Sequence, residues 1–194
     1  MAVSSVANLR RRAPNASRWR RSAFFLGPAT ASAVLTLLAS AYPGGNHLLA
    51  LLAVPAWLLA GLIWLSLLIA RDSHHRRSPW IVATPLIGTL TFALVSSELP
   101  MRTAFLISEP ALTGYARSLP ERERWSSGQE RAGLFTIEKA QRWKGVTRLG
   151  VAGSGGMLVT CGFAHVPDGR VEDLGVSSYS HVTGDWYATC TDHD

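Results

Sequence analysis

The sequence predicts a membrane α fold of three transmembrane helices, followed by a small exported α+β domain with an antiparallel sheet and one helix. Three observations carry this prediction. Three long segments of the first half contain no Asp, Glu, Lys or Arg. Arginines precede the first segment and separate the second from the third, whereas the link between the first two is uncharged. The second half has short alternating apolar and polar runs between turn residues, which is typical of short strands.

The three apolar segments cover residues 22–41, 48–70 and 80–97, which together make the expected membrane region 22–97. A helix needs roughly 20 apolar residues to cross a hydrocarbon layer of about 30 Å. The third segment is the shortest candidate, with 18 residues. Soluble helices of this length show a polar face, and these segments do not, so we expect spans rather than buried core helices.

The charge distribution predicts the orientation. Residues 1–97 hold nine Arg and one acidic residue, Asp72, for a net charge of +8, whereas residues 98–194 hold ten Lys or Arg and twelve acidic residues, for −2. Basic residues stay on the cytoplasmic side of a membrane. We therefore expect a basic cytoplasmic arm over residues 1–21 and an extracytoplasmic domain over 98–194 of a multi-pass protein of the plasma (cell) membrane. The expected partner is the lipid bilayer and not a nucleic acid, although the pI is near 10.0.

Cleavage of the first segment stays open as an alternative. Arg20-Arg21 before an apolar run resembles a twin-arginine export signal, and Ala39-Ser40-Ala41 resembles a signal-peptidase site. The apolar run is longer than a usual signal, so we expect a retained span. Since no ionisable residue lies inside any of the three segments, a pump or an ion-coupled transporter is disfavoured.

Within the expected exported domain, residues 102–107 suggest a strand. Ser108 can cap a helix that runs to about Leu119, with Pro110 in its first turn. The charged segment 121–131 suggests a loop, and the glycines of 150–156 a flexible turn. Five strands are expected over residues 133–140, 146–151, 157–166, 179–182 and 186–190, with turns at 167–169 and 183–184. One helix followed by adjacent strands implies an antiparallel α+β fold.

The chain has two cysteines, Cys161 and Cys190, and both fall on expected strands. Outside the cytoplasm they can form a disulfide, which would contribute roughly 3–4 kcal/mol. Two free buried thiols are the alternative. The cysteines lack the paired spacing of zinc sites, and we predict no metal site and no cofactor.

Two histidines and one tryptophan are the candidate surface or site residues. His165 and His181 lie on expected strands, where together with Asp168 or Asp185 they could form a metal site or an acid–base pair. No motif spacing supports such a pair, and strand histidines are usually only packed or half exposed. Trp125 lies in the polar segment and is the better surface candidate, whereas we expect Trp186 in the core. We predict no catalytic residue, because the sequence contains no hydrolase or zinc-peptidase motif.

Three further histidines lie outside the expected strands. His74 and His75 lie among arginines, where we expect a solvated loop near lipid headgroups. His193 belongs to the terminal tail, which we expect to fray.

Four segments of the second half resemble a group of small uncharacterised actinobacterial integral membrane proteins, which also place a few spans before a compact exported C-terminal domain. These segments are Ala104-Phe-Leu-Ile-Ser-Glu-Pro-Ala-Leu112, Gly133-Leu-Phe-Thr-Ile137, Gly162-Phe-Ala-His-Val-Pro-Asp-Gly169 and Ser178-Tyr-Ser-His-Val-Thr-Gly-Asp-Trp-Tyr187. The resemblance covers roughly the last half of the chain and the general layout of the first. It implies a bacterial plasma-membrane location, and it implies no activity, substrate or catalytic residue.

These observations favour an envelope binding or interaction protein, whose domain contacts a cell-envelope component or another membrane protein. One alternative is an accessory subunit of a membrane transport or secretion complex. The other is an exported enzyme with an unrecognised site, which is the less favoured class. The sequence specifies neither the ligand nor the oligomeric state.

Overall fold

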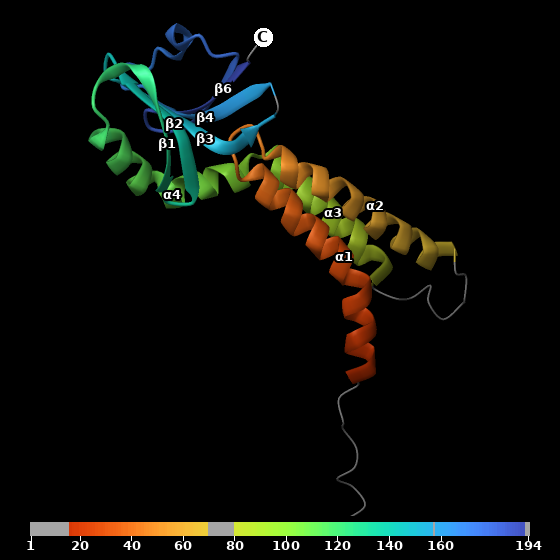
Figure 1. Ribbon diagram of the computed structural model, residues 1–194. Helices are drawn as coiled ribbons and strands as arrows, with labels where there is room; N and C mark the ends of the chain where they lie inside the picture. The colour runs from red at the N-terminus through yellow and green to blue at the C-terminus, as the bar shows by residue number, and fades with distance from the viewer. Residues whose placement is uncertain (1–15, 70–79, 157, 193–194) are drawn as a thin grey trace, which may run out of the picture.

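Four helices precede six strands in the computed structural model, which describes residues 16–69, 80–156 and 158–192 (Figure 1). The helices are α1 (Ala16–Ser40), α2 (His47–Ile69), α3 (Trp80–Ser96) and α4 (Leu99–Ser118). The strands are β1 (Arg122–Ala132), β2 (Phe135–Trp143), β3 (Val146–Gly155), β4 (Val159–His165), β5 (Ser178–Thr183) and β6 (Trp186–Asp192). The short 3-10 helix η2 (Val171–Leu174) lies between β4 and β5. The predictions for the arginines before Ala16, for residues 70–79 with His74 and His75, and for His193 lie outside the described residues.

The three predicted apolar segments are helical and lie side by side in Figure 1. Small side chains allow α1 to approach its neighbours, because Ala33 and Ala60 are buried. The Trp57 indole of α2 donates a hydrogen bond of 2.9 Å to Thr36 Oγ1 of α1. Its ring also packs against Gly88 of α3, where an added Cβ would lie 3.7 Å away. One tryptophan thus links all three helices.

The described helices differ in their capacity to cross a membrane. The segment His47–Ser66 of α2 is long and apolar enough to cross alone. The segments Val82–Ser96 and Leu99–Ser118 pass the same test only as a pair bent by 56°, and Leu26–Ser40 is a shorter apolar helix. By length and composition the described residues therefore contain one or two candidate spans. The three predicted segments are helical, and the prediction that all three cross a membrane is not confirmed by this test.

The six strands form one antiparallel sheet in the order β1-β2-β3-β4-β6-β5. Helix α4 packs on one face of this sheet, which we call the inner face (Figure 1). The fully buried Phe105 of α4 contacts Phe163 of β4 and Trp186 of β6, with ring centroids 4.9 and 5.6 Å apart. The predicted antiparallel α+β fold is confirmed, and we call α4 with the six strands the sheet domain.

The strand predicted over residues 102–107 is wrong, because this segment belongs to α4. The buried side chains Met101, Ala104, Phe105, Ser108 and Leu112 have the three- and four-residue spacing of one helix face. The helix starts with Leu99-Pro100, so Ser108 is an interior residue and not the cap. Buried Ser108 instead accepts a hydrogen bond of 3.0 Å from the Leu134 amide in the β1–β2 turn.

The loop predicted over residues 121–131 is also wrong, because this segment is the edge strand β1. Its described side chains from Arg124 to Arg131 are all exposed, and its composition is therefore as polar as that of a typical loop. Most of the glycine-rich segment 150–156 extends β3, whereas the turns at 167–169 and between β5 and β6 form as predicted.

The tip of the α1–α2 hairpin packs against the sheet domain. Pro43 is fully buried, and the Tyr42 ring meets the Phe135 ring edge-on with centroids 6.0 Å apart. The Gly155 amide of β3 donates a hydrogen bond of 2.8 Å to the Gly45 carbonyl, and Asn46 pairs with Gly155 as a parallel bridge. The hairpin tip and the sheet domain therefore lie at the same end of the helices (Figure 1).

Candidate ligand-binding face

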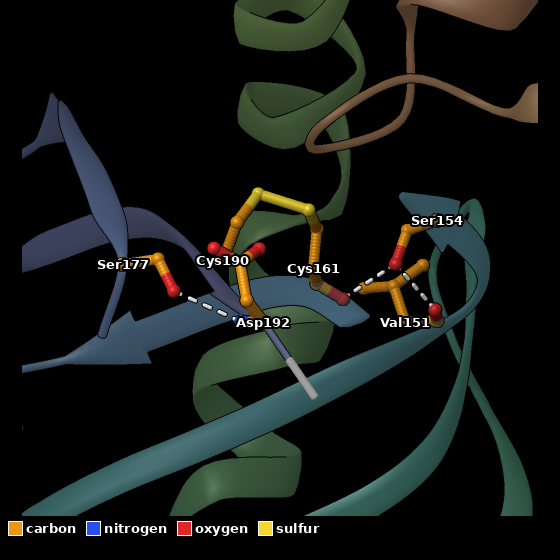
Figure 2. The surroundings of a disulfide bond; sticks show 6 residues. All are labelled: Val151, Ser154, Cys161, Ser177, Cys190 and Asp192. Carbon is orange, nitrogen blue, oxygen red and sulfur yellow. Dashed lines mark hydrogen bonds between the residues drawn. A yellow bond between two sulfur atoms is a disulfide. The ribbon is translucent and has the colours of Figure 1, made fainter. Parts of the chain in front are cut away.

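The two cysteines form the predicted disulfide. Cys161 and Cys190 are direct partners on β4 and β6, with Cα atoms 4.1 Å apart (Figure 2). The bridge lies beside the hairpin tip, because a Cβ on Gly44 would overlap the Cys161 sulfur and would lie 3.0 Å from the Cys190 sulfur. The Ser154 hydroxyl, which has one proton to donate, faces both the Val151 and the Cys161 carbonyl oxygens within hydrogen-bonding distance (Figure 2). Neither cysteine is a free thiol.

The structure does not bring the two candidate histidines together. In the sheet register His165 is the partner of Trp186, whereas His181 is the partner of Tyr187. Because successive residues of a strand point to opposite faces, the two histidines lie on opposite faces. His165 packs on Trp186 with ring centroids 5.0 Å apart, and His181 Nε2 lies 2.8 Å from the Gly184 carbonyl oxygen. Among the described residues, no group of three or more His, Cys, Asp or Glu could hold a metal ion.

The sheet face opposite α4, which we call the outer face, carries a hollow of about 360 Å³. Side chains of Trp125, Lys139 and Arg148 line it, together with three threonines, Thr160, Thr189 and Thr191. Gly175, just after η2, closes one side. This first hollow thus combines one exposed indole, two cationic groups and several hydroxyl groups.

Two glycines make the bottom of the first hollow. Gly150 of β3 and Gly162 of β4 are direct partners, and Lys139 and Thr189 continue the same row on the flanking strands. A Cβ on Gly162 would overlap the Leu149 carbonyl oxygen and would lie 2.9 Å from the Gly150 Cα. A side chain at Gly162 is therefore excluded by the close backbone approach, which leaves the sheet bare there.

A second hollow of about 290 Å³ adjoins the first on the outer face. Its lining includes Trp143, Lys144, Asp168 and Arg170. Trp143 is 40% exposed and Trp125 is 47% exposed, so each hollow has one accessible indole. Arg148 lines both hollows and therefore stands between them.

Arg148 is the central cation of this face. Its guanidinium donates a hydrogen bond to the Leu174 carbonyl, and it lies 5.8 Å from the centroid of the Trp125 ring. Burial lowers the pKa of the Arg148 guanidinium, which nevertheless stays charged at neutral pH. No carboxylate among the described side chains forms an ion pair with Arg148. A half-buried cation held by a carbonyl and an indole can still accept an anionic partner.

The structure locates the two tryptophans that the sequence singled out. Trp125 is exposed as predicted, although it lies on β1 and not in a loop, and Trp186 is 3% exposed in the core. Sequence reasoning missed Lys139, Arg148 and the glycine pair. Arg148 and Gly150 are two residues apart on β3, and this spacing in the sequence indicates that they share one face of the sheet. Only the strand register shows that Gly162 lies beside Gly150.

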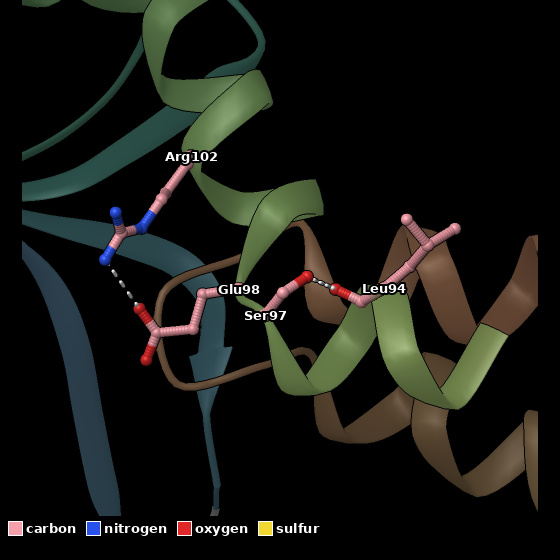
Figure 3. A network of polar contacts seen from close by, with 4 residues as sticks. All are labelled: Leu94, Ser97, Glu98 and Arg102. Atoms are coloured by element: carbon pink, nitrogen blue, oxygen red, sulfur yellow. Dashed lines mark hydrogen bonds and ion pairs between the residues drawn. The ribbon is translucent and has the colours of Figure 1, made fainter. Parts of the chain in front are cut away.

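A third hollow, of about 460 Å³, lies where the helix ends meet the sheet domain. Its charged lining residue is Glu98, at the junction of α3 and α4, with a left-handed φ of 56°. The Glu98 carboxylate lies 3.6 Å from the Arg102 guanidinium, and Ser97 donates to the Leu94 carbonyl (Figure 3). Because Glu98 is already paired, this hollow offers less ligand chemistry than the outer face.

A comparison with protein-family models, with curated proteins and with solved structures finds no match to this chain. The class of protein is therefore defined by its own parts: apolar helices joined to a disulfide-bonded antiparallel sheet domain whose outer face carries two adjacent hollows.

Proposed function

We propose that this chain is an integral membrane protein of the plasma membrane that displays its sheet domain outside the cytoplasm as a binding module for an envelope component. The observation that carries the proposal is the outer face, where two adjacent hollows share Arg148. Concave sites with a few convergent polar groups and an aromatic side chain are typical of ligand binding.

The helices supply the anchor. Large apolar side chains of α2 and α3 are exposed along the bundle, including Leu51, Leu58, Leu62, Leu86 and Phe92. A water-soluble protein rarely exposes so large a contiguous apolar surface, whereas lipid chains would cover it favourably. The 17 residues of α3 reach the lower limit of a span, and α3 packs beside α2 through Trp57, so we assign all three helices to the membrane.

Helix α4 then lies at the membrane surface and is not the second half of a bent span. Its buried side packs on the sheet through Phe105 and Leu112. Its opposite side exposes Leu106 and Ile107, and Arg102 on that side is paired with Glu98. A helix with one exposed apolar side can lie in the headgroup region of a membrane. A bend of 56° from α3 would bring α4 close to the membrane plane if α3 is tilted by about 30°, within the usual range.

The contact between the hairpin tip and β3 supports the orientation. Because the tip and the sheet domain share one end of the helices, Ile69 at the end of α2 and Trp80 at the start of α3 belong to the other end. The sequence between these two residues contains Arg71, Arg76 and Arg77, which favour the cytoplasmic side. The disulfide is in keeping with an oxidising compartment for the sheet domain.

Single cysteines introduced at two positions test this arrangement in intact cells. Gly128→Cys lies on exposed β1, where an added Cβ meets nothing within 4 Å, and Ser73→Cys lies in the sequence between Arg71 and Arg76. The native cysteines stay paired and do not react. A membrane-impermeant maleimide should label Gly128→Cys in intact cells and Ser73→Cys only after permeabilisation. The reverse pattern would overturn the proposed location of the binding face.

The two other expected functions, an accessory subunit of a transport or secretion complex and an exported enzyme, have no comparable observation in their favour among the described residues. The predicted histidine pair, which an enzyme could have used, is divided between the two faces of the sheet.

A further inference from the structure

We infer that the outer face binds a chain of anionic sugars, with one part of the chain in each hollow and Arg148 between them. This inference rests on the proposed function and specifies its ligand. The acidic group can be a carboxylate on the sugar or a phosphodiester between sugars, since a guanidinium and an ammonium group bind both.

Charge is the first argument for this ligand. The lining of the two hollows includes four basic side chains, Lys139, Lys144, Arg148 and Arg170, against one described acidic side chain, Asp168. Cations gathered along one concave strip attract an anion, and Arg148 has no carboxylate partner among the described side chains. The excess is local, because the second half of the chain has a net charge of −2.

The second argument is the combination of exposed indoles with hydroxyl groups. Trp125 and Trp143 present accessible aromatic surface in the two hollows. The C–H face of a sugar ring packs on an indole, while its hydroxyl groups need donors and acceptors such as those of Thr189 and Thr191. A purely apolar ligand would leave these polar groups without partners.

Shape is the third argument. Volumes of about 360 and 290 Å³ lie close to the lower limit of the range for small-molecule sites, about 300–1,000 Å³, which suits one or two sugar rings in each hollow. The bare Gly150–Gly162 floor lets a flat ring approach the sheet backbone. Because the hollows share Arg148, a linked chain could occupy both at once and gain from the linkage.

Aromatic and basic groups together also suit single-stranded nucleic acid. A nucleic acid would require the outer face to be in the cytoplasm, which contradicts the arrangement we propose. The test therefore includes a nucleic-acid probe.

Binding is measured by fluorescence anisotropy with the full chain in nanodiscs of zwitterionic lipid. The probes are labelled tetragalacturonate, a glucosylated glycerol-phosphate oligomer, and fully methyl-esterified tetragalacturonate as the neutral control. We expect at least one of the two acidic probes to bind at least tenfold more tightly than the neutral control, with weaker binding at high salt. The acidic probe that binds more tightly identifies the source of the negative charge. Monogalacturonate should compete at least tenfold less well than the tetramer if both hollows are used.

Matched variants locate the site. Arg148→Gln should weaken binding of the acidic probe at least tenfold, whereas Arg131→Gln, which removes the same charge from exposed β1, should change it less than twofold. Lys139→Gln is the second site variant, because exposed Lys139 makes misfolding unlikely to explain a loss. Equal binding of the neutral tetramer, an equal loss in Arg131→Gln, or equally tight binding of an eight-residue single-stranded DNA would overturn the inference.

Two negative results are distinguishable. If neither acidic probe binds while maleimide labels Gly128→Cys from outside, the inference about the ligand fails and the proposed location stands. If the labelling shows Gly128→Cys inside the cell, both fail together.

Discussion

At the residue scale, the absence of a side chain at Gly44 lets the helix hairpin contact the disulfide. Gly44 and Gly45 both have positive φ, 68° and 77°, in the turn between α1 and α2. Their surroundings differ, because an added Cβ at Gly44 would overlap the Cys161 sulfur, whereas at Gly45 the nearest atom is the Ala39 carbonyl oxygen at 3.8 Å. A substitution at Gly45 therefore introduces backbone strain alone, whereas the same substitution at Gly44 introduces backbone strain and a steric clash.

We predict that Gly44→Ala destabilises the protein more than Gly45→Ala. Both substitutions carry the cost of a left-handed alanine, about 1–2 kcal/mol. Gly44→Ala adds the cost of displacing the hairpin tip from the disulfide, about 1–3 kcal/mol. Thermal unfolding of the detergent-solubilised protein measures both. Equal losses in the two variants would mean that the hairpin tip does not rest on the bridge.

The glycine floor gives a second matched pair. Gly162→Ala should weaken the pairing of β3 with β4 and lower stability by about 1–3 kcal/mol, because its methyl group would overlap the Leu149 carbonyl. Gly150→Ala should be tolerated to within about 1 kcal/mol, since its methyl group would meet Lys139 Cβ at an ordinary 3.4 Å. Unfolding midpoints of the two variants check this. A Gly162→Ala protein as stable as Gly150→Ala would contradict the described approach of the two strands.

At the element scale, β4 and β6 are joined twice, by seven register pairs and by the disulfide. The chain between β4 and β6 contains η2 and the edge strand β5, so the disulfide closes a long loop of the chain. The Tyr179 hydroxyl of β5 donates a hydrogen bond of 3.1 Å to the Glu172 carboxylate of η2, and this bond raises the pKa of Tyr179. These contacts order the segment that borders both hollows.

We predict that reduction of the Cys161–Cys190 bond lowers the free energy of unfolding by about 3–4 kcal/mol, because the cysteines are separated by 29 residues. Thermal unfolding with and without a thiol reductant measures the effect. The control is the double variant Cys161→Ser/Cys190→Ser, which should be as unstable as the reduced protein and insensitive to reductant. The predicted contribution would be refuted if reductant did not change the unfolding temperature of the wild-type protein.

A side chain from β2 caps the C-terminal end of α4. The Arg142 guanidinium of β2 donates hydrogen bonds of 3.2 and 3.4 Å to the carbonyls of Arg117 and Leu119. A cation at a helix C-terminus satisfies carbonyls that have no partner within the helix and interacts favourably with the helix dipole.

Arg142→Ala should therefore destabilise the sheet domain by about 1 kcal/mol, mainly through fraying of the last turn of α4. The exposed Arg131→Ala on β1 is the control and should change stability by less than about 0.5 kcal/mol. Hydrogen exchange of the amides of residues 114–118 would report the fraying. Unchanged exchange in Arg142→Ala would exclude this role.

At the scale of the whole molecule, two bodies with different surfaces meet at the hairpin tip (Figure 1). The helices expose leucines along their length, whereas the sheet domain buries its phenylalanines between α4 and the inner face. The junction holds Tyr42, Pro43 and Gly44 against the domain, so the proposed anchor and binding module are packed together and not merely tethered.

The proposed anchoring predicts different effects for two arginine substitutions on α2. Leu58 and Leu48 are 64% and 60% exposed, but Leu58 lies near the centre of the helix and Leu48 at its first turn. Leu58→Arg should cost about 2.5–3.5 kcal/mol of insertion, whereas an arginine at position 48 can reach the interface. Alkaline extraction of membranes should release more Leu58→Arg than Leu48→Arg protein. Equal retention of both would argue against α2 as a span.

Several features could be predicted from the sequence because they depend on local pattern. The apolar segments become helices, and the alternation around Cys161 and Cys190 predicts strands that the structure confirms. Residues 102–107 are wrongly predicted as a strand, because the helical spacing of Phe105 and Leu112 is visible only when the residues on both sides of Ser108 are considered together. The exposed edge strand β1 has too little apolar alternation to be recognised as a strand, and Trp125 therefore falls in a predicted loop.

The sequence by itself determined the helical segments, the class of the sheet domain and the two cysteines that could pair, because hydropathy, charge and periodicity are properties of neighbouring residues. The tertiary structure alone decided which distant residues meet. Strand register separates His165 from His181, places Gly150 beside Gly162 and brings Trp125 to Arg148. These contacts depend on sheet order and on which face each strand buries, and no short stretch of sequence contains that information.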